Sequence, residues 1–452
     1  MTEGNGARAG EFVAGIARKE FPEAVREGAR FCIADWTGVA LGAIGLPPVA
    51  ALADVCAGWA SAGPCPVLSG GRMAAAPAAL VNGTLAHTLD FDDTHVGSIA
   101  HLSGPTWAAA WAAAAEVGAD PAAAVRGFVA GFEIGARLGG GGFGVATNER
   151  HTHATGVFGC LGAAAAAASV YGLDAAGVQA ALGLAATQVG GLTASFGTPA
   201  KPFHAGKAAF NGVLAAQMAR RGYPAALDLL EPGGGLDRAL VQDGSVRVQP
   251  LDFDEGWEIT RNTFKPYASC LLTHPVIDAG RSLVSTVDPA SIETIRVMVH
   301  PLAIQLAGKT APTTPYEGKF SLAYTVALAL AGRTATQGDF TDDNVGDPAL
   351  QALVRKVELV PTEGMALTAA ALQVLEKTGR THDVEVPLAL GNPGRPMTWS
   401  DMRAKFLSLA APKLGEERAE RLFDGLRRIE TARWSDLEGL LTLPGHASGV
   451  RP

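Results

Sequence analysis

The sequence has few of the residues on which covalent crosslinks and structural metal sites depend. Only five of its 452 residues are cysteines, and they are widely separated, with no C-x-x-C pair. An odd number of scattered cysteines predicts neither a disulfide framework nor a structural zinc site. We therefore expect most of these cysteines to be small residues of the core.

Positive charge is also scarce. The chain has 36 lysines and arginines against 44 aspartates and glutamates, which gives a net charge of −8, and no segment gathers basic residues with interleaved aromatics. This pattern argues against a nucleic-acid partner. An anionic substrate would have to be attracted by a local cluster of Lys, Arg and His that acts against the net charge.

Signals for export and for membrane insertion are missing from the pattern. Residues 1–25 contain acidic residues and a helical spacing where a signal peptide would have a basic start and an apolar block, so we expect a cytoplasmic protein. The long apolar stretch 157–173 is dominated by alanine and glycine. This composition favours a buried helix over a membrane span, and we expect no membrane partner.

Helical periodicity is what the sequence has in abundance. From about residue 10 to residue 250, apolar residues recur at i, i+3, i+4 and i+7, and Asp or Pro precedes several of the segments. Beyond residue 257, short β-branched runs alternate with helical segments, and residues 400–430 have the helical period again. We predict a mainly α protein with an α+β part: a large all-helical domain of residues 1–257, completed by 396–452, and a smaller α+β domain of residues 258–395.

A cluster of titratable residues interrupts the apolar pattern at AHTLDFDDTHVGSIAHLSGP, residues 86–105, with three aspartates and three histidines. In one interpretation Asp90, Asp92 and Asp93 lie on an Asp-rich helix that holds a divalent metal, as in terpene synthases. Such an enzyme would also need a second metal motif and a large aromatic pocket, whereas this chain has 6% aromatic residues.

Two simpler interpretations of the same cluster are open. A mononuclear metal site could use His87, Asp90 and His95, although no familiar ligand spacing supports it. Any one of the aspartates could instead cap the next helix and satisfy loop amides.

The string GGGGFG at 139–144 contains G-x-G-x-x-G, but it follows a predicted helix and not a strand, so it does not predict a dinucleotide site.

Three other stretches gather polar groups within apolar surroundings. They are RHTHATGVFG (150–159), GTPAKPFHAGKAAFNG (197–212) and FKPYASCLLTHPVIDA (264–279). Each lysine in them could be a surface residue, and His204 and His274 could be hydrogen-bonded core residues. Together with residues 86–105, these stretches supply cations that can hold carboxylates and His or Asp that can move protons.

The same four stretches resemble the MmgE/PrpD family, whose members include 2-methylcitrate dehydratase, cis-aconitate decarboxylase and iminodisuccinate epimerase. The resemblance rests on VNGTLAHTLDFDDTH followed by H-x-S-G, on K-P-x-H-x-G-x-A-A-x-N-G and on K-P-Y-x-x-C with a following T-H, in order over nearly the whole chain. It implies a large helical domain built from both chain ends, a smaller α+β lid domain, a homodimer, and no required metal or organic cofactor.

The resemblance also implies a set of site residues. A base would be His101 or His151, Asp90 would orient it or act as partner acid, and Tyr324 would be the second acid that a dehydratase needs. The candidate catalytic residues are therefore His101, His151, Asp90 and Tyr324. The candidate substrate-binding residues are Thr94, Lys201, Lys207, Lys265 and Cys270.

One position departs from part of the family. Where the decarboxylase has a histidine, this chain has Cys270, as the epimerase-like branch does together with the G-K-F-S string at 318–321. This difference argues against cis-aconitate decarboxylation.

The function we expect is that of a cofactor-independent acid/base enzyme. It would abstract or deliver a proton next to a carboxylate in a small di- or tricarboxylate, as a hydro-lyase or as an epimerase. Two alternatives stay open: a metal-dependent prenyl or terpene-type enzyme that uses the Asp-rich segment, and a family member without catalysis that serves in binding or assembly.

Overall fold

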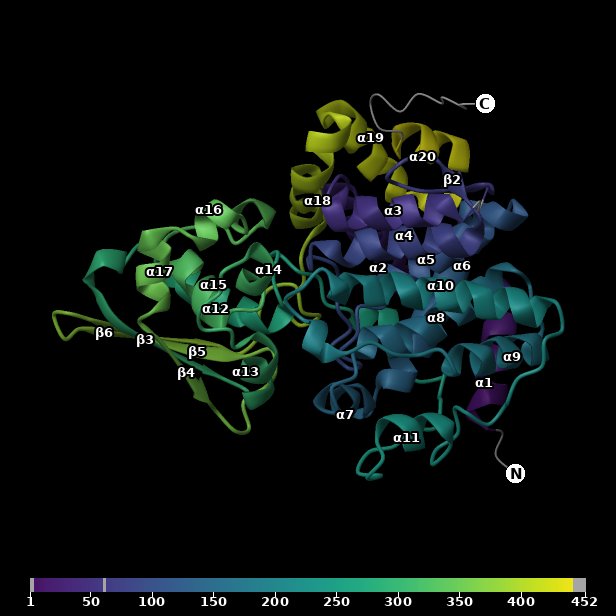
Figure 1. The fold of residues 1–452 in the computed structure, drawn as a ribbon, viewed down its shortest axis with the longest axis horizontal. Helices are drawn as coiled ribbons and strands as arrows, with labels where there is room; N and C mark the ends of the chain where they lie inside the picture. The colour runs from purple at the N-terminus through teal and green to yellow at the C-terminus, as the bar shows by residue number, and fades with distance from the viewer. Residues whose placement is uncertain (1–3, 60–61, 442–452) are drawn as a thin grey trace.

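The computed structural model describes residues 4–59 and 62–441, which form a larger helical lobe and a smaller lobe that combines helices with a sheet (Figure 1). The larger lobe also contains the short strands β1 (Cys65–Pro66) and β2 (Arg72–Met73). Its helices before the smaller lobe are α1 (Asn5–Gly15), α2 (Glu23–Ala43), α3 (Pro47–Gly58), α4 (Ala75–Thr88), α5 (Ser103–Val117), α6 (Pro121–Gly139), α7 (Phe143–Glu149), α8 (Ala154–Val170), α9 (Ala175–Ala186), α10 (Ala200–Arg220) and α11 (Gly235–Leu240).

Several helices begin at the capping residues that the sequence predicted. The side chain of Asp120 accepts a hydrogen bond from the backbone N–H of Ala123 at the start of α6, where Pro121 occupies the first turn. Asp174 accepts from the N–H of Gly177 at the start of α9 in the same way. Each carboxylate satisfies an N–H group that has no partner within the helix, so each helix begins at a defined residue.

Helix α8 lies at the centre of the larger lobe and packs against α5, α6, α9 and α10. All its residues from Ala154 to Ala168 are buried, as predicted for this apolar stretch. It lies very close to α6, because a methyl group added to Gly162 would come within 2.7 Å of the carbonyl oxygen of Gly131. That distance is too short for a real contact, so the two backbones can approach this closely only with glycine at both positions.

The smaller lobe is built on a four-stranded sheet in the order β4-β3-β5-β6. The pair β3/β4 is parallel, whereas β3/β5 and β5/β6 are antiparallel. Helix α12 packs on β5 and β6, and the buried residues Leu372 and Val374 alternate along β5 with more exposed ones. The elements of this lobe are α12 (His274–Leu283), β3 (Ile292–Val299), α13 (Pro301–Ala307), α14 (Pro315–Gly318), α15 (Leu322–Leu330), α16 (Asp342–Val345), α17 (Pro348–Val354), β4 (Val357–Pro361), β5 (Ala370–Glu376) and β6 (Thr381–Val386).

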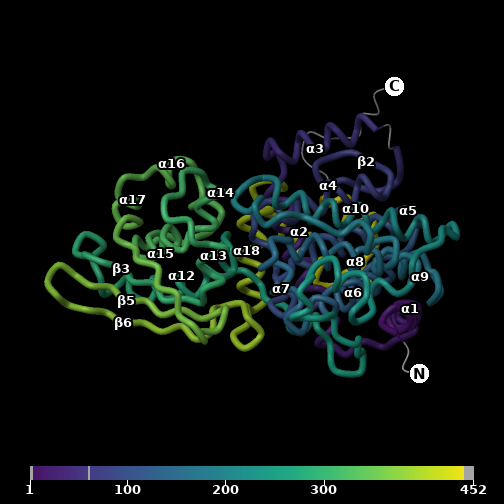
Figure 2. Tube along the Cα trace, turned by 60° about the horizontal axis from the view of Figure 1, so that its bottom comes forward, coloured from purple at the N-terminus to yellow at the C-terminus, as the bar shows by residue number. Residues whose placement is uncertain are grey.

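After the smaller lobe the chain returns to the larger one through α18 (Trp399–Leu414), α19 (Glu416–Leu426) and α20 (Trp434–Leu441). Helix α18 packs against α2, and Figure 2 shows it beside α2 on the side that faces the smaller lobe. The mainly helical fold with an α+β part is therefore confirmed. The division of the chain at residues 257 and 395 stays a prediction.

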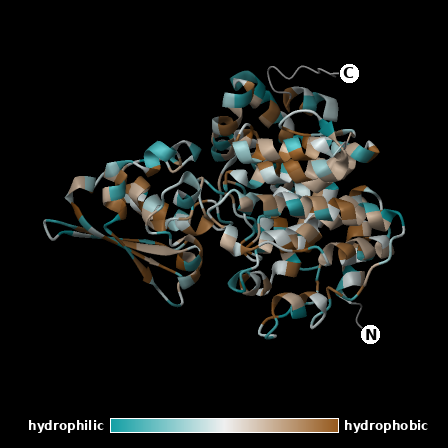
Figure 3. Cartoon of the chain, in the orientation of Figure 1, coloured by the Kyte–Doolittle hydropathy of each residue, from teal (hydrophilic) through white to brown (hydrophobic). Residues whose placement is uncertain are grey.

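Hydrophobic residues follow the central helices of the larger lobe, whereas α16 and the outer turns of the smaller lobe are hydrophilic (Figure 3). Within the described ranges, no single helix is long and apolar enough to cross a membrane. Helices α2 and α3 meet the two requirements of length and apolar character only together, as a pair that is bent by 94°.

Candidate active site

The site is built on the loop that follows α4. That helix ends at Thr88, and residues 89–102 form the connection to α5. Asp90 and Ile99 have φ angles of 51° and 49°, in the left-handed region that non-glycine residues seldom occupy. The three aspartates thus lie on an irregular loop. The alternative interpretation that placed them on an Asp-rich helix is wrong, because α4 ends at Thr88, before the first of them.

Asp90 is held by two buried lysines. Its Oδ1 lies 2.5 Å from Nζ of Lys201, on α10, and 3.2 Å from Nζ of Lys265. Burial alone would raise the pKa of Asp90, but the two ammonium groups outweigh it and hold that pKa well below its ordinary value. Asp90 is therefore a carboxylate at any physiological pH.

Three buried lysines also hold the backbone of the loop, through the carbonyl oxygens of residues 89–91. These lysines, all less than a tenth exposed, each donate to one carbonyl oxygen from a different part of the chain. Lys319 follows α14 in the smaller lobe, and burial lowers its pKa to about 7. Lys405 belongs to α18. The contacts are Lys319 to Leu89, Lys265 to Asp90 at 2.9 Å and Lys405 to Phe91 at 2.5 Å.

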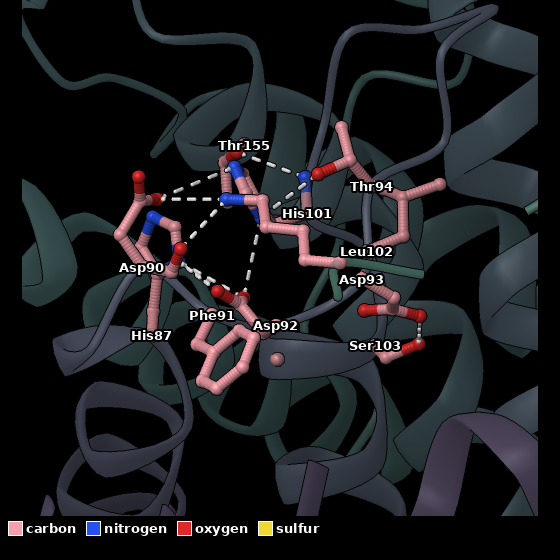
Figure 4. A network of polar contacts seen from close by, with 12 residues as sticks. His87, Asp90, Phe91, Asp92, Asp93, Thr94, His101, Leu102, Ser103 and Thr155 are labelled. Atoms are coloured by element: carbon pink, nitrogen blue, oxygen red, sulfur yellow. Dashed lines mark hydrogen bonds and ion pairs between the residues drawn. The ribbon is translucent and has the colours of Figure 1, made fainter. Parts of the chain in front are cut away.

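Asp92 lies between two histidines (Figure 4). Its carboxylate is 2.9 Å from Nδ1 of His87 and 3.3 Å from Nδ1 of His101. Burial lowers the pKa of His101 to about 3 and that of His87 below its ordinary value. Both imidazoles are therefore neutral at pH 7. Because the Asp92 carboxylate faces Nδ1 of His101, it favours the tautomer with the proton on Nδ1, and Nε2 is then the nitrogen that can take up a proton.

Asp93 points away from these groups. It accepts hydrogen bonds from Oγ of Ser103 and from Nδ2 of Asn262. Burial, together with the charge of Asp35, raises the pKa of Asp93 to about 7. This carboxyl group secures the loop to the start of α5 and to the chain segment that leads into the smaller lobe.

A cavity opens beside Asp90 and His101, between the two lobes. Thr94 lies on its wall with Oγ1 3.4 Å from Nδ1 of His101, and the backbone of Thr94 pairs with that of Thr263. Cys270 also lines the cavity, and burial raises the pKa of its thiol, which stays protonated at neutral pH. The predicted site residues that line this cavity are Asp90, Thr94, His101, Lys201, Lys265 and Cys270.

His151 does not reach the cavity. It is exposed, with a φ of 62° in the turn after α7. His153 takes that place: it is buried at the N-cap of α8, lines the cavity, and has its Nδ1 3.0 Å from Nδ1 of His204. The sequence does not separate the two histidines, because Thr152 lies between them and both precede the apolar stretch.

Tyr324 and Lys207 do not line the cavity either. Tyr324 is fully buried in α15, and its hydroxyl donates to the carbonyl oxygen of Asp339 at 3.1 Å. Lys207 is exposed on α10 and donates to Oδ1 of Asn211. The reason lies in helix geometry, because six residues after Lys201 an α-helix has turned by about 240° beyond one full turn, onto another face.

A possible metal site differs from the one that the sequence suggested. Nε2 of His95 is bound to Glu258 at 3.0 Å, so this histidine is engaged elsewhere. The residues that offer ligand atoms within 4.8 Å of one another are His87, Asp90, Asp92 and His101. They suit a divalent cation poorly for two reasons. The carboxylate of Asp92 is already in contact with both imidazoles, and the two ammonium groups beside Asp90 would repel the metal ion.

Comparison with known proteins matches nearly the whole chain. The MmgE/PrpD N-terminal domain matches residues 7–249, and the MmgE/PrpD C-terminal domain matches residues 267–429. A cis-aconitate decarboxylase of Homo sapiens is 27% identical over 391 residues, which cover 83% of this chain and 80% of that protein. One of Aspergillus terreus is 26% identical over 463 residues, which cover 95% of this chain and 93% of that protein.

Proposed function

Because the chain belongs to the MmgE/PrpD family, we propose that it is a cofactor-independent acid/base enzyme that moves a proton next to a carboxylate of a small di- or tricarboxylate. One observation carries this proposal. Two buried lysines surround Asp90 on the wall of one cavity, and a neutral histidine that is paired with a second carboxylate lies on the same wall.

The two lysines address the difficult part of the reaction. A carbon next to a carboxylate is a weak acid, because the carboxylate already carries negative charge. Positive charge that is placed in advance beside the developing anion lowers this barrier. Nζ of Lys201 and Nζ of Lys265 are both directed at Asp90 and line the cavity, so a substrate carboxylate could share their hydrogen bonds.

His101 is our candidate for the base. It is neutral, and Asp92 orients it through Nδ1, as a carboxylate orients the histidine of many acid/base sites. The charge of a substrate carboxylate beside the ring would raise its low pKa toward a value suited to proton transfer. His153 replaces Tyr324 as the candidate for a second acid or base, because it lines the same cavity.

Two reaction types are compatible with this proposal, a lyase and an epimerase. The relatives are named as decarboxylases, which favours a lyase. Cys270, by contrast, resembles the epimerase-like branch of the family. An epimerase would need His101 and His153 on opposite sides of one carbon, whereas a dehydratase would need one of them to protonate the departing hydroxyl.

We also propose a homodimer, with partners otherwise limited to the small-molecule substrate. The family resemblance supports it, as do apolar side chains that face solvent near α10, of which Trp59 is 51% and Phe203 39% exposed. A cytoplasmic location stays an expectation drawn from the sequence.

The test is proton exchange in deuterated water. The protein is incubated with a panel of small di- and tricarboxylates, and deuterium incorporation and products are followed by NMR. We expect one acid to exchange a proton on the carbon next to a carboxylate, and His101→Asn to abolish this exchange while His151→Ala keeps it. Loss of water or carbon dioxide identifies a lyase, and inversion without loss identifies an epimerase. A folded protein that exchanges no proton on any acid would refute the proposal.

Chelation separates this proposal from the metal-dependent alternative. We expect activity to survive EDTA. Complete loss with EDTA, restored by one divalent cation, would assign His87, Asp90, Asp92 and His101 to a metal.

A further inference from the structure

The cavity beside Asp90 changes in chemistry from its floor to its mouth. Its floor is polar: Asp90, Thr94, His101, Lys201 and Lys265 are all buried. Its half-buried lining comes from both lobes and is mainly aliphatic, with Phe196 and Cys270 as the exceptions. These half-buried aliphatic residues are Val96, Ile99, Leu272, Leu306 and Leu367, which we call the aliphatic rim.

The charges on the floor leave little room for a highly charged ligand. Lys201 and Lys265 are already paired with Asp90, and Asp92 adds a second carboxylate. Burial lowers the pKa of His101 to about 3, so it adds no positive charge at pH 7. Among the described residues, no arginine lines this cavity. A third substrate carboxylate would meet either the aliphatic rim or the uncharged polar side chains of Asn148, His153 and Thr368, and would lose water without gaining a charged partner.

Ile99 gives an independent reason to connect the rim with function. Its φ of 49° is unfavourable for a β-branched side chain. The conformation is held by the turn of Val96 to Ala100, in which the N–H of Ile99 donates to the carbonyl of Val96 at 3.2 Å and Ala100 pairs with His95. Strained residues of this kind persist where the surroundings impose them, and they concentrate at binding sites.

From these observations, and on the basis of the proposed function, we propose that the substrate is a dicarboxylate with a hydrocarbon arm and not a tricarboxylate. Its carboxylates would bind at the polar floor, and its arm would lie against the aliphatic rim. Burial of one methylene group is worth about a fourfold gain in affinity. An arm of several carbons would therefore outweigh a further carboxylate as a determinant of binding.

Calorimetry with a graded series of ligands tests this proposal. The series is succinate, 2-methylsuccinate, 2-propylsuccinate and 2-pentylsuccinate, with tricarballylate as the tricarboxylate. For the unmodified chain we expect affinity to rise about fourfold per methylene until the rim is filled, and 2-propylsuccinate to bind more tightly than tricarballylate.

Two variants locate the arm. Leu306→Lys should flatten the dependence on arm length and strengthen binding of tricarballylate. Val284→Lys is the matched control, because Val284 is 43% exposed on the same lobe and does not line the cavity, so the dependence should persist. Circular dichroism confirms that both variants are folded.

Different results of these measurements would contradict the inference and the proposed function. An affinity that does not change with arm length, tightest binding by tricarballylate, or an unchanged dependence in Leu306→Lys would overturn the inference. The aliphatic rim would then serve only as contact between the lobes. Because binding is measured without turnover, a protein that binds the long arms but exchanges no proton would refute the proposed function alone. Proton exchange on a tricarboxylate with no effect of arm length would refute the inference alone.

Discussion

Helix α8 and the loop 89–102 lie in the same lobe, but they are stabilised in opposite ways. The helix consists of small apolar residues whose close contacts supply dispersion and hydrophobic energy. The loop buries carboxylates and imidazoles, and each charge costs free energy unless a partner compensates it. If the proposed function is right, stability resides mainly in the helical packing and chemistry in the loop, so substitutions should separate the two.

The largest effect should come from His101. General acid/base groups contribute about 10²–10⁴-fold, so His101→Asn should lower kcat by that order. Its melting temperature should change little, because the asparagine amide keeps a donor beside the Asp92 carboxylate. His151→Ala, outside the cavity, is the control and should match the unmodified chain. A marked loss of melting temperature with kcat per folded molecule intact would place His101 among the packing residues and move the base to His153.

Lys265 should show a smaller effect, on both properties. A charge-assisted contact is worth about 1.5–3 kcal/mol, so Lys265→Met should raise KM roughly 10- to 150-fold. The melting temperature should fall as well, because the carbonyl oxygen of Asp90 loses its donor. Lys207→Met is the matched control on the exposed face of α10. Equal kinetics for the two variants would contradict a role for Lys265 at the cavity.

In the helical region the expected effect is on stability alone. Gly131→Ala inserts a methyl group against the carbonyl of Gly162, which should cost about 1–3 kcal/mol of unfolding free energy. The kcat of the folded fraction should be unchanged. Gly15→Ala, where the structure has no atom within 4 Å of the added methyl group, should cost nothing. Chemical denaturation measures both, and a large loss of kcat in Gly131→Ala would contradict the separation of the two regions.

The smallest effect concerns pH. The pKa of Asp93 is about 7 in the folded chain, above the ordinary value of about 4 in the unfolded chain. Between these values the folded state holds a proton that the unfolded state has lost, so the unfolding free energy falls as pH rises, by up to about 1.4 kcal/mol per pH unit. Asp93→Asn should reduce this slope in urea titrations from pH 5 to 8. Gly131→Ala should instead lower the unfolding free energy by the same amount at every pH. An unchanged slope in Asp93→Asn would show that this carboxyl group is ionised throughout.

The helices were predictable from the sequence because their signals are local. The unbroken apolar stretch, rich in alanine, indicates α8, and Asp120 marks the start of α6. Within the site, the motifs led to Asp90, His101 and Lys265, but not to Lys405, which binds a carbonyl 314 residues away in the sequence. Contacts between residues so far apart in the chain cannot be predicted from the spacing of residues in the sequence.

Tyr324 illustrates the same limit within one helix. Periodicity shows that a residue is buried, and Tyr324 is. It does not show which neighbour the hydroxyl meets, and here that neighbour is the carbonyl of Asp339 and not a substrate.

The three lysines on successive carbonyls have a consequence for the newly made chain. Lys405 lies on α18, which the ribosome makes after the whole smaller lobe, and Lys319 lies in that lobe. Residues 89–91 emerge long before either lysine, so the loop cannot take its final form during most of synthesis. Assembly of this loop therefore waits for the docking of α18, and a half-made chain carries Asp90, Asp92 and His101 without the contacts that position them.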